Sequence, residues 1–155
     1  MEFLKQRKLM AGLALVAVVA PAVAHHSFAL YNMEKTFEFT GVVTRVNPDA
    51  NHLQVFFAEM NPERKNVVRG EDGKPIVWAI EMTGSAQAAQ DGISVGTFPP
   101  GTIFSGAMHP LRSGEKAGSR VGALVKCPEK KPPTAGKHCD TVDGSTKLGG
   151  GTLAN

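Results

Sequence analysis

The interior of this chain is built from short segments whose apolar and polar side chains alternate, and this pattern constrains the fold more than any other feature. In Phe37–Asn47, the set Phe37, Phe39, Gly41 and Val43 alternates with the set Glu38, Thr40, Val42 and Thr44, and aromatic and β-branched residues are frequent. Such a period of two is typical of a half-buried β-strand. Turn clusters rich in Asn, Pro, Asp and Gly separate the segments. We therefore expect five strands, at residues 37–47, 53–59, 76–82, 102–108 and 120–126.

One helix interrupts these strands. Alanines within Ser85–Gln90 favour a short helix, which Thr83 or Ser85 would cap and Gly92 would end. The expected order is three strands, a short helix and two strands. That order predicts an all-β domain of the small barrel type that binds oligonucleotides or oligosaccharides in other proteins, with the helix closing one end. A small five-stranded β-sandwich is the alternative.

The N-terminal segment has the three parts of a secretory signal peptide. A basic start precedes the uncharged run Leu9–Ala20, and the small-residue box Ala22-Val23-Ala24 follows Pro21. A membrane anchor would need about 20 apolar residues, and this run is shorter. We expect cleavage after Ala24, a mature chain that starts at His25, and a periplasmic or secreted location.

Cleavage after Ala24 would divide the chain and lower the net charge of the part that remains. We expect a signal peptide at 1–24, an N-terminal arm at 25–36, the barrel at 37–127 and a Pro-, Gly- and Lys-rich tail at 128–155. The full chain carries +3, and the signal peptide, with three basic residues and one acid, carries +2 of it. A net charge near +1 on the mature chain does not indicate the basic surface that nucleic-acid-binding proteins have. We expect no membrane span once the signal is removed, and a small ligand or protein as partner.

Two cysteines, Cys127 and Cys139, remain in the mature chain. In an oxidising compartment, such a pair is most simply a disulfide. It would hold part of the tail in a loop and leave the end of the tail loose. A thiolate metal site with His138 is the alternative, although the spacing matches no structural zinc pattern.

Histidines are the candidate metal ligands. Cleavage after Ala24 gives His25 a free α-amine, which can chelate a metal together with the Nδ1 atom of its own ring. A second imidazole would complete a three-nitrogen site, the histidine brace, which suits copper(II). His26, His52 and His109 are the candidates for it, and Met108 could add a soft axial ligand.

Recognisable catalytic motifs do not occur in the sequence, since no serine has a nucleophile-elbow context and no Gly-rich phosphate loop precedes a helix. Trp78 and Glu81 of the third strand could line a ligand groove, although Glu81 alternates outward and is expected to be solvated. We therefore predict an exported, non-catalytic binding or accessory module. A copper-binding protein and a small enzyme that uses Glu81 are the alternatives.

The chain also resembles a family of small exported bacterial proteins of unknown function, whose mature chain begins His-His-Ser-Phe. The resemblance lies in 25–29, in Thr40–Pro48, in the tryptophan strand 77–82 and in Pro100-Gly101-Thr102. Members usually have a histidine directly after the Asn-Pro pair, whereas Asp49 follows it here. The resemblance implies a periplasmic or secreted β-domain and leaves its biochemistry open.

Overall fold

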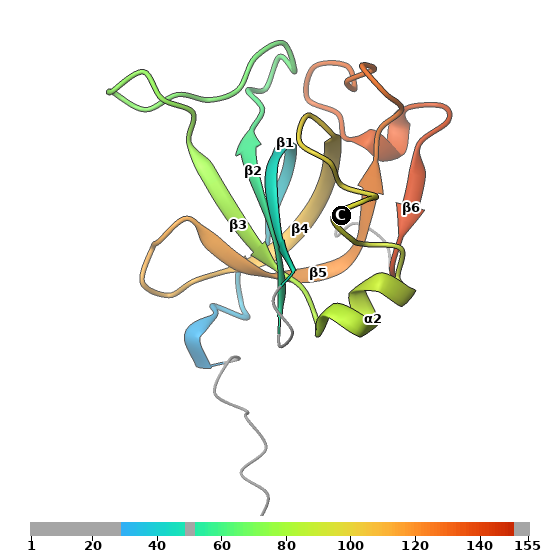
Figure 1. Ribbon diagram of the computed structural model, residues 1–155. Helices are drawn as coiled ribbons and strands as arrows, with labels where there is room; N and C mark the ends of the chain where they lie inside the picture. Colours follow the sequence, from blue (N-terminus) through green and yellow to red (C-terminus); the bar gives the residue numbers. More distant parts are fainter. Residues whose placement is uncertain (1–28, 49–51, 151–155) are drawn as a thin grey trace, which may run out of the picture.

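The computed structural model describes residues 29–48 and 52–150, so the signal peptide, His25 and His26 lie outside the described residues. Figure 1 shows a body of curved strands with the short helix α2 at its lower right. The strands and helices are β1 (Phe37–Pro48), β2 (Leu53–Glu59), β3 (Val77–Glu81), α2 (Ser85–Gln90), β4 (Ile103–Pro110), β5 (Ala117–Lys126), a 3₁₀ helix (Cys139–Thr141) and β6 (Thr146–Leu148).

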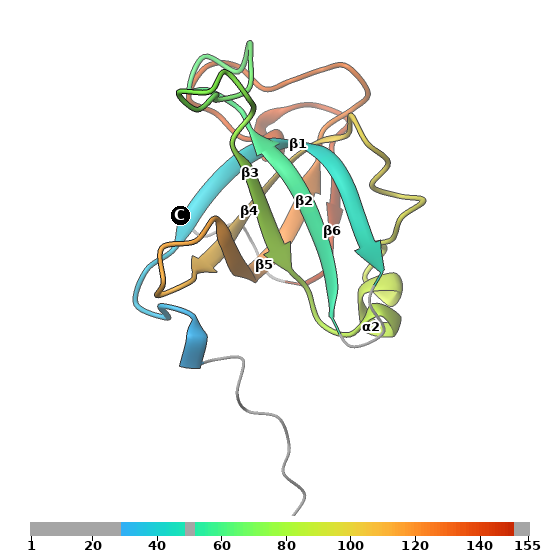
Figure 2. The ribbon, with the colours of Figure 1, turned by 60° about the vertical axis from the view of Figure 1, so that its left-hand side comes forward.

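The first five strands close into a barrel, as Figure 2 shows from the side. β1 pairs with β2 and β4, β2 pairs with β3, and β4 pairs with β5, all in antiparallel orientation. A parallel pairing of β3 with β5, at Ala79–Glu81 against Ala117–Ser119, closes the circle. The all-β small barrel expected from the sequence is therefore confirmed, and the sandwich is not the architecture of the chain.

Stacked aromatic rings fill the barrel. The rings of Phe39 and Phe57 lie 4.1 Å apart, and Phe104 meets each of them edge-on at 5.4 Å. Glycines give these rings room: a Cβ atom at Gly41 would collide with Phe57, and one at Gly106 would come within 2.6 Å of a Leu124 methyl. Burial of each large apolar side chain stabilises the fold by about 1.5–3 kcal/mol, so this core holds the strands in register.

The helix α2 closes one end of the barrel, as expected. Ala88 of α2, together with Ile93 and Phe98 just after it, belongs to the same buried core as the barrel strands. The helix is capped differently from the prediction, since its N-cap residue is Gly84, which has no side chain to cap with. Gly92 follows the helix with a positive φ of 80°, the left-handed conformation that glycine adopts readily.

The C-terminal segment, residues 128–148, is more ordered than its composition suggests. Cys127 and Cys139 form a disulfide with a Cα–Cα distance of 5.0 Å, which confirms the predicted pairing. Val125, the disulfide and Val142 make a second apolar cluster apart from the main core. Beyond the disulfide, where we expected a loose tail, β6 pairs with β5 and Leu148 packs against the main core.

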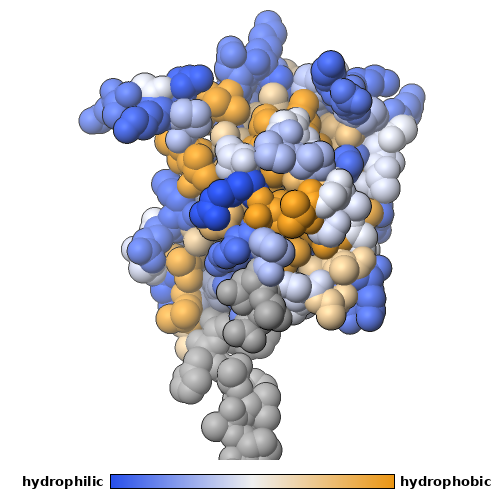
Figure 3. Space-filling model, in the orientation of Figure 1, coloured by the Kyte–Doolittle hydropathy of each residue, from blue (hydrophilic) through white to orange (hydrophobic). Residues whose placement is uncertain are grey.

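The surface is mixed in character. In Figure 3, hydrophobic residues gather near the middle of the face shown, and hydrophilic residues border them above and at the sides. Among residues 29–48 and 52–150, the structure has no helix that is long and apolar enough to cross a membrane.

Candidate functional site

Glu81, expected to be solvated, is instead held by two side chains on the outer face of the barrel. Its neighbour Ile80 points into the core and is fully buried, so Glu81 points outward. The Tyr31 hydroxyl donates a hydrogen bond to Oε2 of Glu81 at 3.0 Å. Nδ1 of His52 lies 3.4 Å from Oε1. These three residues form a continuous polar chain, which we call the Tyr31–Glu81–His52 chain.

Tyr31 belongs to the part of the N-terminal arm that lies across the end of β4. Tyr31 forms a β-bridge with Leu111. The amide of Asn32 donates to the Pro110 carbonyl at 2.8 Å, and the amide of Arg112 donates to the Leu30 carbonyl at 2.9 Å. Backbone hydrogen bonds thus place the arm, and they bring the tyrosine ring over the outer face of the barrel.

Burial controls the acidity of this tyrosine. Tyr31 is 5% exposed. Burial, the negative charge of Glu81 and the hydrogen bond to it together raise the pKa of Tyr31 to about 12, and burial is the largest of these causes. The phenol therefore stays protonated at neutral pH, and it acts as a hydrogen-bond donor to the carboxylate.

His52 is oriented by this carboxylate. Nδ1 is the ring nitrogen that faces the carboxylate, 3.4 Å from Oε1, and the side chain is 52% exposed. Histidines that bind metals usually have a carboxylate or a carbonyl next to their second ring nitrogen.

His109 has a related arrangement farther around the barrel. Its Nδ1 atom lies 2.7 Å from the backbone carbonyl of Lys35. A carbonyl only accepts, so Nδ1 is the donor and Nε2 keeps its lone pair. In the sheet, Ser119 of β5 pairs with Glu81 on one side and with His109 on the other. Directly paired residues share a face of the sheet, so both histidine environments lie outside the barrel.

Other predicted site residues lie elsewhere. Trp78 faces the barrel interior, where it stacks on Phe37 at 4.6 Å and donates from Nε1 to Glu59. Trp78 and Glu81 therefore lie on opposite faces of β3 and do not line one groove. Met108 is fully buried in the core, so it faces away from His109 and is not placed to be an axial ligand beside it.

Within the described part of the chain, no group of three or more histidine, cysteine or acidic residues is arranged to hold a metal ion. His52 and His109 each present one nitrogen. His25 and His26, the other predicted ligands, lie outside the described residues. The predicted metal site therefore stays a prediction. Of its candidate ligands, the structure describes His52 and His109, which lie on the outer face of the barrel.

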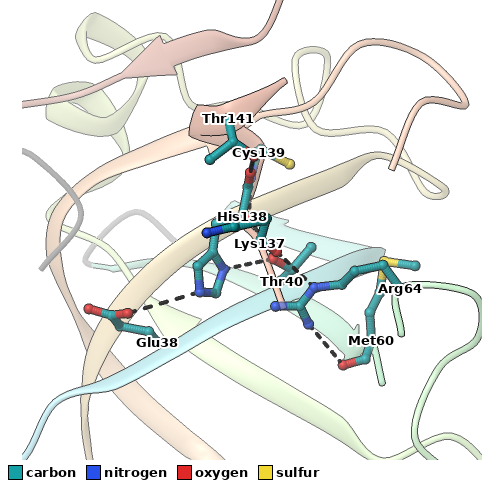
Figure 4. A network of polar contacts seen from close by, with 9 residues as sticks. Glu38, Thr40, Met60, Arg64, Lys137, His138, Cys139 and Thr141 are labelled. Carbon is teal, nitrogen blue, oxygen red and sulfur yellow. Dashed lines mark hydrogen bonds and ion pairs between the residues drawn. The ribbon is translucent and has the colours of Figure 1, made fainter. Parts of the chain in front are cut away.

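A second polar network, which no sequence pattern predicts, joins the C-terminal segment to the barrel (Figure 4). Thr40 and Ser105 are fully buried, and their hydroxyl oxygens are 2.7 Å apart. Thr40 also meets Nδ1 of His138 at 2.8 Å, and the Cys139 amide donates to Ser105 at 2.9 Å. Nε2 of His138 lies 3.9 Å from a Glu38 oxygen. Because the hydroxyls are buried, this network holds the C-terminal segment against the barrel. It is not placed to contact a substrate.

A cleft of about 490 Å³ lies beside the disulfide and away from Glu81. Prolines and aliphatic side chains make up much of its lining. It is formed by Val42, residues 99–103 and residues 126–130. Nζ of Lys126 donates to the Thr97 carbonyl at 2.7 Å, so this lysine already has a partner.

Comparison with protein families finds one model that matches, over residues 13–120. The chain belongs to DUF6152, a family of unknown function. Searches of curated proteins and of solved structures return no match. The DUF6152 match includes every member of the Tyr31–Glu81–His52 chain and His109, whereas His138 and Cys139 lie beyond it. The outer-face site therefore belongs to the part of the chain that the family model describes.

Membership of DUF6152 agrees with the resemblance to a family of unknown function. The His-His-Ser-Phe start and export stay predictions.

Proposed function

We propose that the mature protein is an exported, non-catalytic binding module whose site lies on the outer face of the barrel, where the N-terminal arm meets it. The observation that carries this proposal is the Tyr31–Glu81–His52 chain. It joins the arm to β3 and to the start of β2, and it leaves an oriented imidazole half exposed. An oriented, accessible imidazole next to a carboxylate is a binding group for a cation.

Export is tested by the location of the protein and by the first residue of its processed form. The basic start, the apolar run and the Ala-x-Ala box support a signal peptide that ends at Ala24. Expression of the full chain in a Gram-negative host, followed by fractionation, should give a periplasmic protein whose first residue is His25. A protein that stays in the cytoplasm with Met1 intact would contradict export.

Copper(II) is the ligand that this site suits best. A free His25 offers an amine and an imidazole, and copper(II) ranks highest among divalent first-row metals for nitrogen sites. The specific observation in favour is that two of the predicted ligands, His52 and His109, lie on the outer face of the barrel near the arm, where Nδ1 of His52 is 3.4 Å from a Glu81 oxygen and Nδ1 of His109 is 2.7 Å from the Lys35 carbonyl. The amine has an ordinary pKa near 8, so copper can displace its proton at modest cost.

The copper proposal is tested by moving the α-amine. Isothermal titration of copper(II) into the processed protein should give one tight site. A form with one extra residue before His25 keeps every side chain but loses the chelate between the amine and its own imidazole, so it should bind much more weakly. Equal affinity in the two forms would contradict a brace.

The enzyme alternative has less support from the geometry. A carboxylate that acts as a general base needs a free oxygen within reach of the substrate. Both oxygens of Glu81 already have partners, Tyr31 and His52, and the cleft near the disulfide does not include Glu81. We therefore assign Glu81 to the orientation of His52.

A further inference from the structure

We propose that the cleft beside the disulfide binds a small aliphatic carboxylate, with the hydrocarbon chain of the ligand against the apolar lining and its carboxylate at the ammonium of Lys126. This site is separate from the outer-face site, and the inference does not rest on the copper function. The cleft has a volume of about 490 Å³, which lies within the range of about 300–1,000 Å³ that small-molecule sites have.

The apolar lining of the cleft favours an aliphatic ligand. Val42 belongs to β1, and Ile103 is the first residue of β4. Three prolines, Pro99, Pro100 and Pro128, add apolar ring carbons. Among the described residues that line the cleft, none is aromatic. Stacking of an aromatic ligand needs an aromatic partner, so this lining suits a hydrocarbon chain better than a planar ring.

The wall of the cleft that residues 127–130 form is fixed by the fold. The Cys127 amide donates to the Ile103 carbonyl at 2.9 Å, and the Lys131 amide donates to the Pro128 carbonyl at 3.1 Å. The second of these bonds closes a turn, and the disulfide ties the start of the wall to the C-terminal segment. The cleft is therefore preformed, as sites for small molecules usually are.

Lys126 supplies the positive charge that selects an anion. This lysine is partly buried, and its Nζ donates to the Thr97 carbonyl at 2.7 Å. An ammonium has three N–H donors, so this contact leaves two of them. Within the described part of the chain, no ion pair joins Lys126 to an acidic side chain. A charge held away from water is usually paired with an opposite charge, and the carboxylate of a ligand would supply it.

The other two charged residues of the cleft offset each other. Nζ of Lys130 lies 3.8 Å from Oε1 of Glu129, and both side chains are 89% exposed. The net charge of the cleft is therefore the single positive charge of Lys126. This charge favours a carboxylate head group and disfavours a cationic one.

Isothermal titration of the purified protein, with its disulfide intact, tests the site. Three probes share one hydrocarbon chain and differ in the head group: decanoate, decanol and decyltrimethylammonium. We expect decanoate to bind at one site, decanol to bind more weakly, and the cation to bind most weakly. A protein that does not bind decanoate, or that binds decanoate and the cation equally well, would overturn the proposal.

A substitution at Lys126 tests the charged part of the site. Lys126→Met keeps the length of the side chain and removes its charge, so it should lose about 10–100-fold in affinity for decanoate and keep its affinity for decanol. Lys147→Met is the matched control, because Lys147 is exposed on β6 and does not line the cleft. It should match the wild type. Equal affinity for decanoate in the wild type and in Lys126→Met would contradict the role of Lys126.

A substitution at Val42 tests the apolar part, and it does not depend on whether Lys126→Met folds. Val42→Thr adds a hydroxyl to the lining with little change in shape, so it should weaken the binding of decanoate and of decanol alike. Unchanged binding of both probes would show that the hydrocarbon chain does not lie in this cleft. Fluorescence of Trp78, the single tryptophan, monitors folding in each form.

Discussion

Tyr31 is the single tyrosine of the chain, so the ultraviolet absorbance of the phenolate reports its ionisation alone. Burial, followed by the Glu81 charge and hydrogen bond, raises the pKa of Tyr31 to about 12. We expect the native protein to titrate near that value and the unfolded chain to titrate near about 10. In Glu81→Gln the pKa should fall but remain above 10, because burial is the largest cause and is unchanged.

This shift also links stability to pH. The native state favours the protonated phenol, so the stabilisation is fully present below about pH 10 and is lost as the pH rises through about 12. Chemical denaturation at several alkaline pH values should show this decline, which is absent in Tyr31→Phe. A native tyrosine that titrates near pH 10 would contradict the burial of Tyr31 against the barrel.

Removal of the Thr40 hydroxyl tests whether the second polar network stabilises the fold. Thr40→Val keeps the shape of the side chain but leaves Ser105 and His138 without their shared partner. We expect the free energy of unfolding to fall by about 1–3 kcal/mol, measured by urea denaturation with Trp78 fluorescence. Thr44→Val is the control, since Thr44 is exposed on the same strand, and it should change stability by less than about 0.5 kcal/mol. Equal effects would contradict a structural role for the network.

The disulfide is the main constraint on the C-terminal segment at the scale of secondary-structure elements. It joins residues 12 apart in sequence, and removal of a native disulfide of this kind costs about 2–4 kcal/mol. We expect Cys127→Ala/Cys139→Ala to lose this stability but to keep the circular dichroism of the barrel, because the β-strand pairings do not depend on the sulfurs. Loss of the β signal at low temperature would show that the barrel depends on the disulfide.

Strand positions could be predicted from the sequence because inward side chains must be apolar and must occur at every second residue. The second strand was predicted at the residues where β2 lies, and β1 extends one residue beyond its prediction. β5 begins at Ala117, three residues before its predicted start, because Ala117–Ser119 pair with β3 through backbone atoms and carry no alternation. β6 was missed for a similar reason, since three residues at a sheet edge leave no periodic signal.

The site was harder to predict because its contacts are far apart in the sequence. Glu81 alternates outward, as expected, but its partner Tyr31 lies 50 residues earlier. No local pattern indicates that the side chain of Tyr31 reaches Glu81 of β3, so a solvated Glu81 is what the sequence predicts. His138 and Thr40, 98 residues apart, are a second case. Pairings of this kind become visible only when the closed barrel brings its outer faces and the flanking segments together.

For the whole molecule, the central proposal is that export creates the binding site, because cleavage after Ala24 would give His25 a free α-amine that can chelate copper together with its own imidazole. Native mass spectrometry of the protein recovered from the exported fraction of copper-supplemented cells tests this claim most directly. The account predicts the mass of residues 25–155 with one disulfide and one copper ion. A chain that begins at any other residue, or the correctly cut chain without copper, would contradict it.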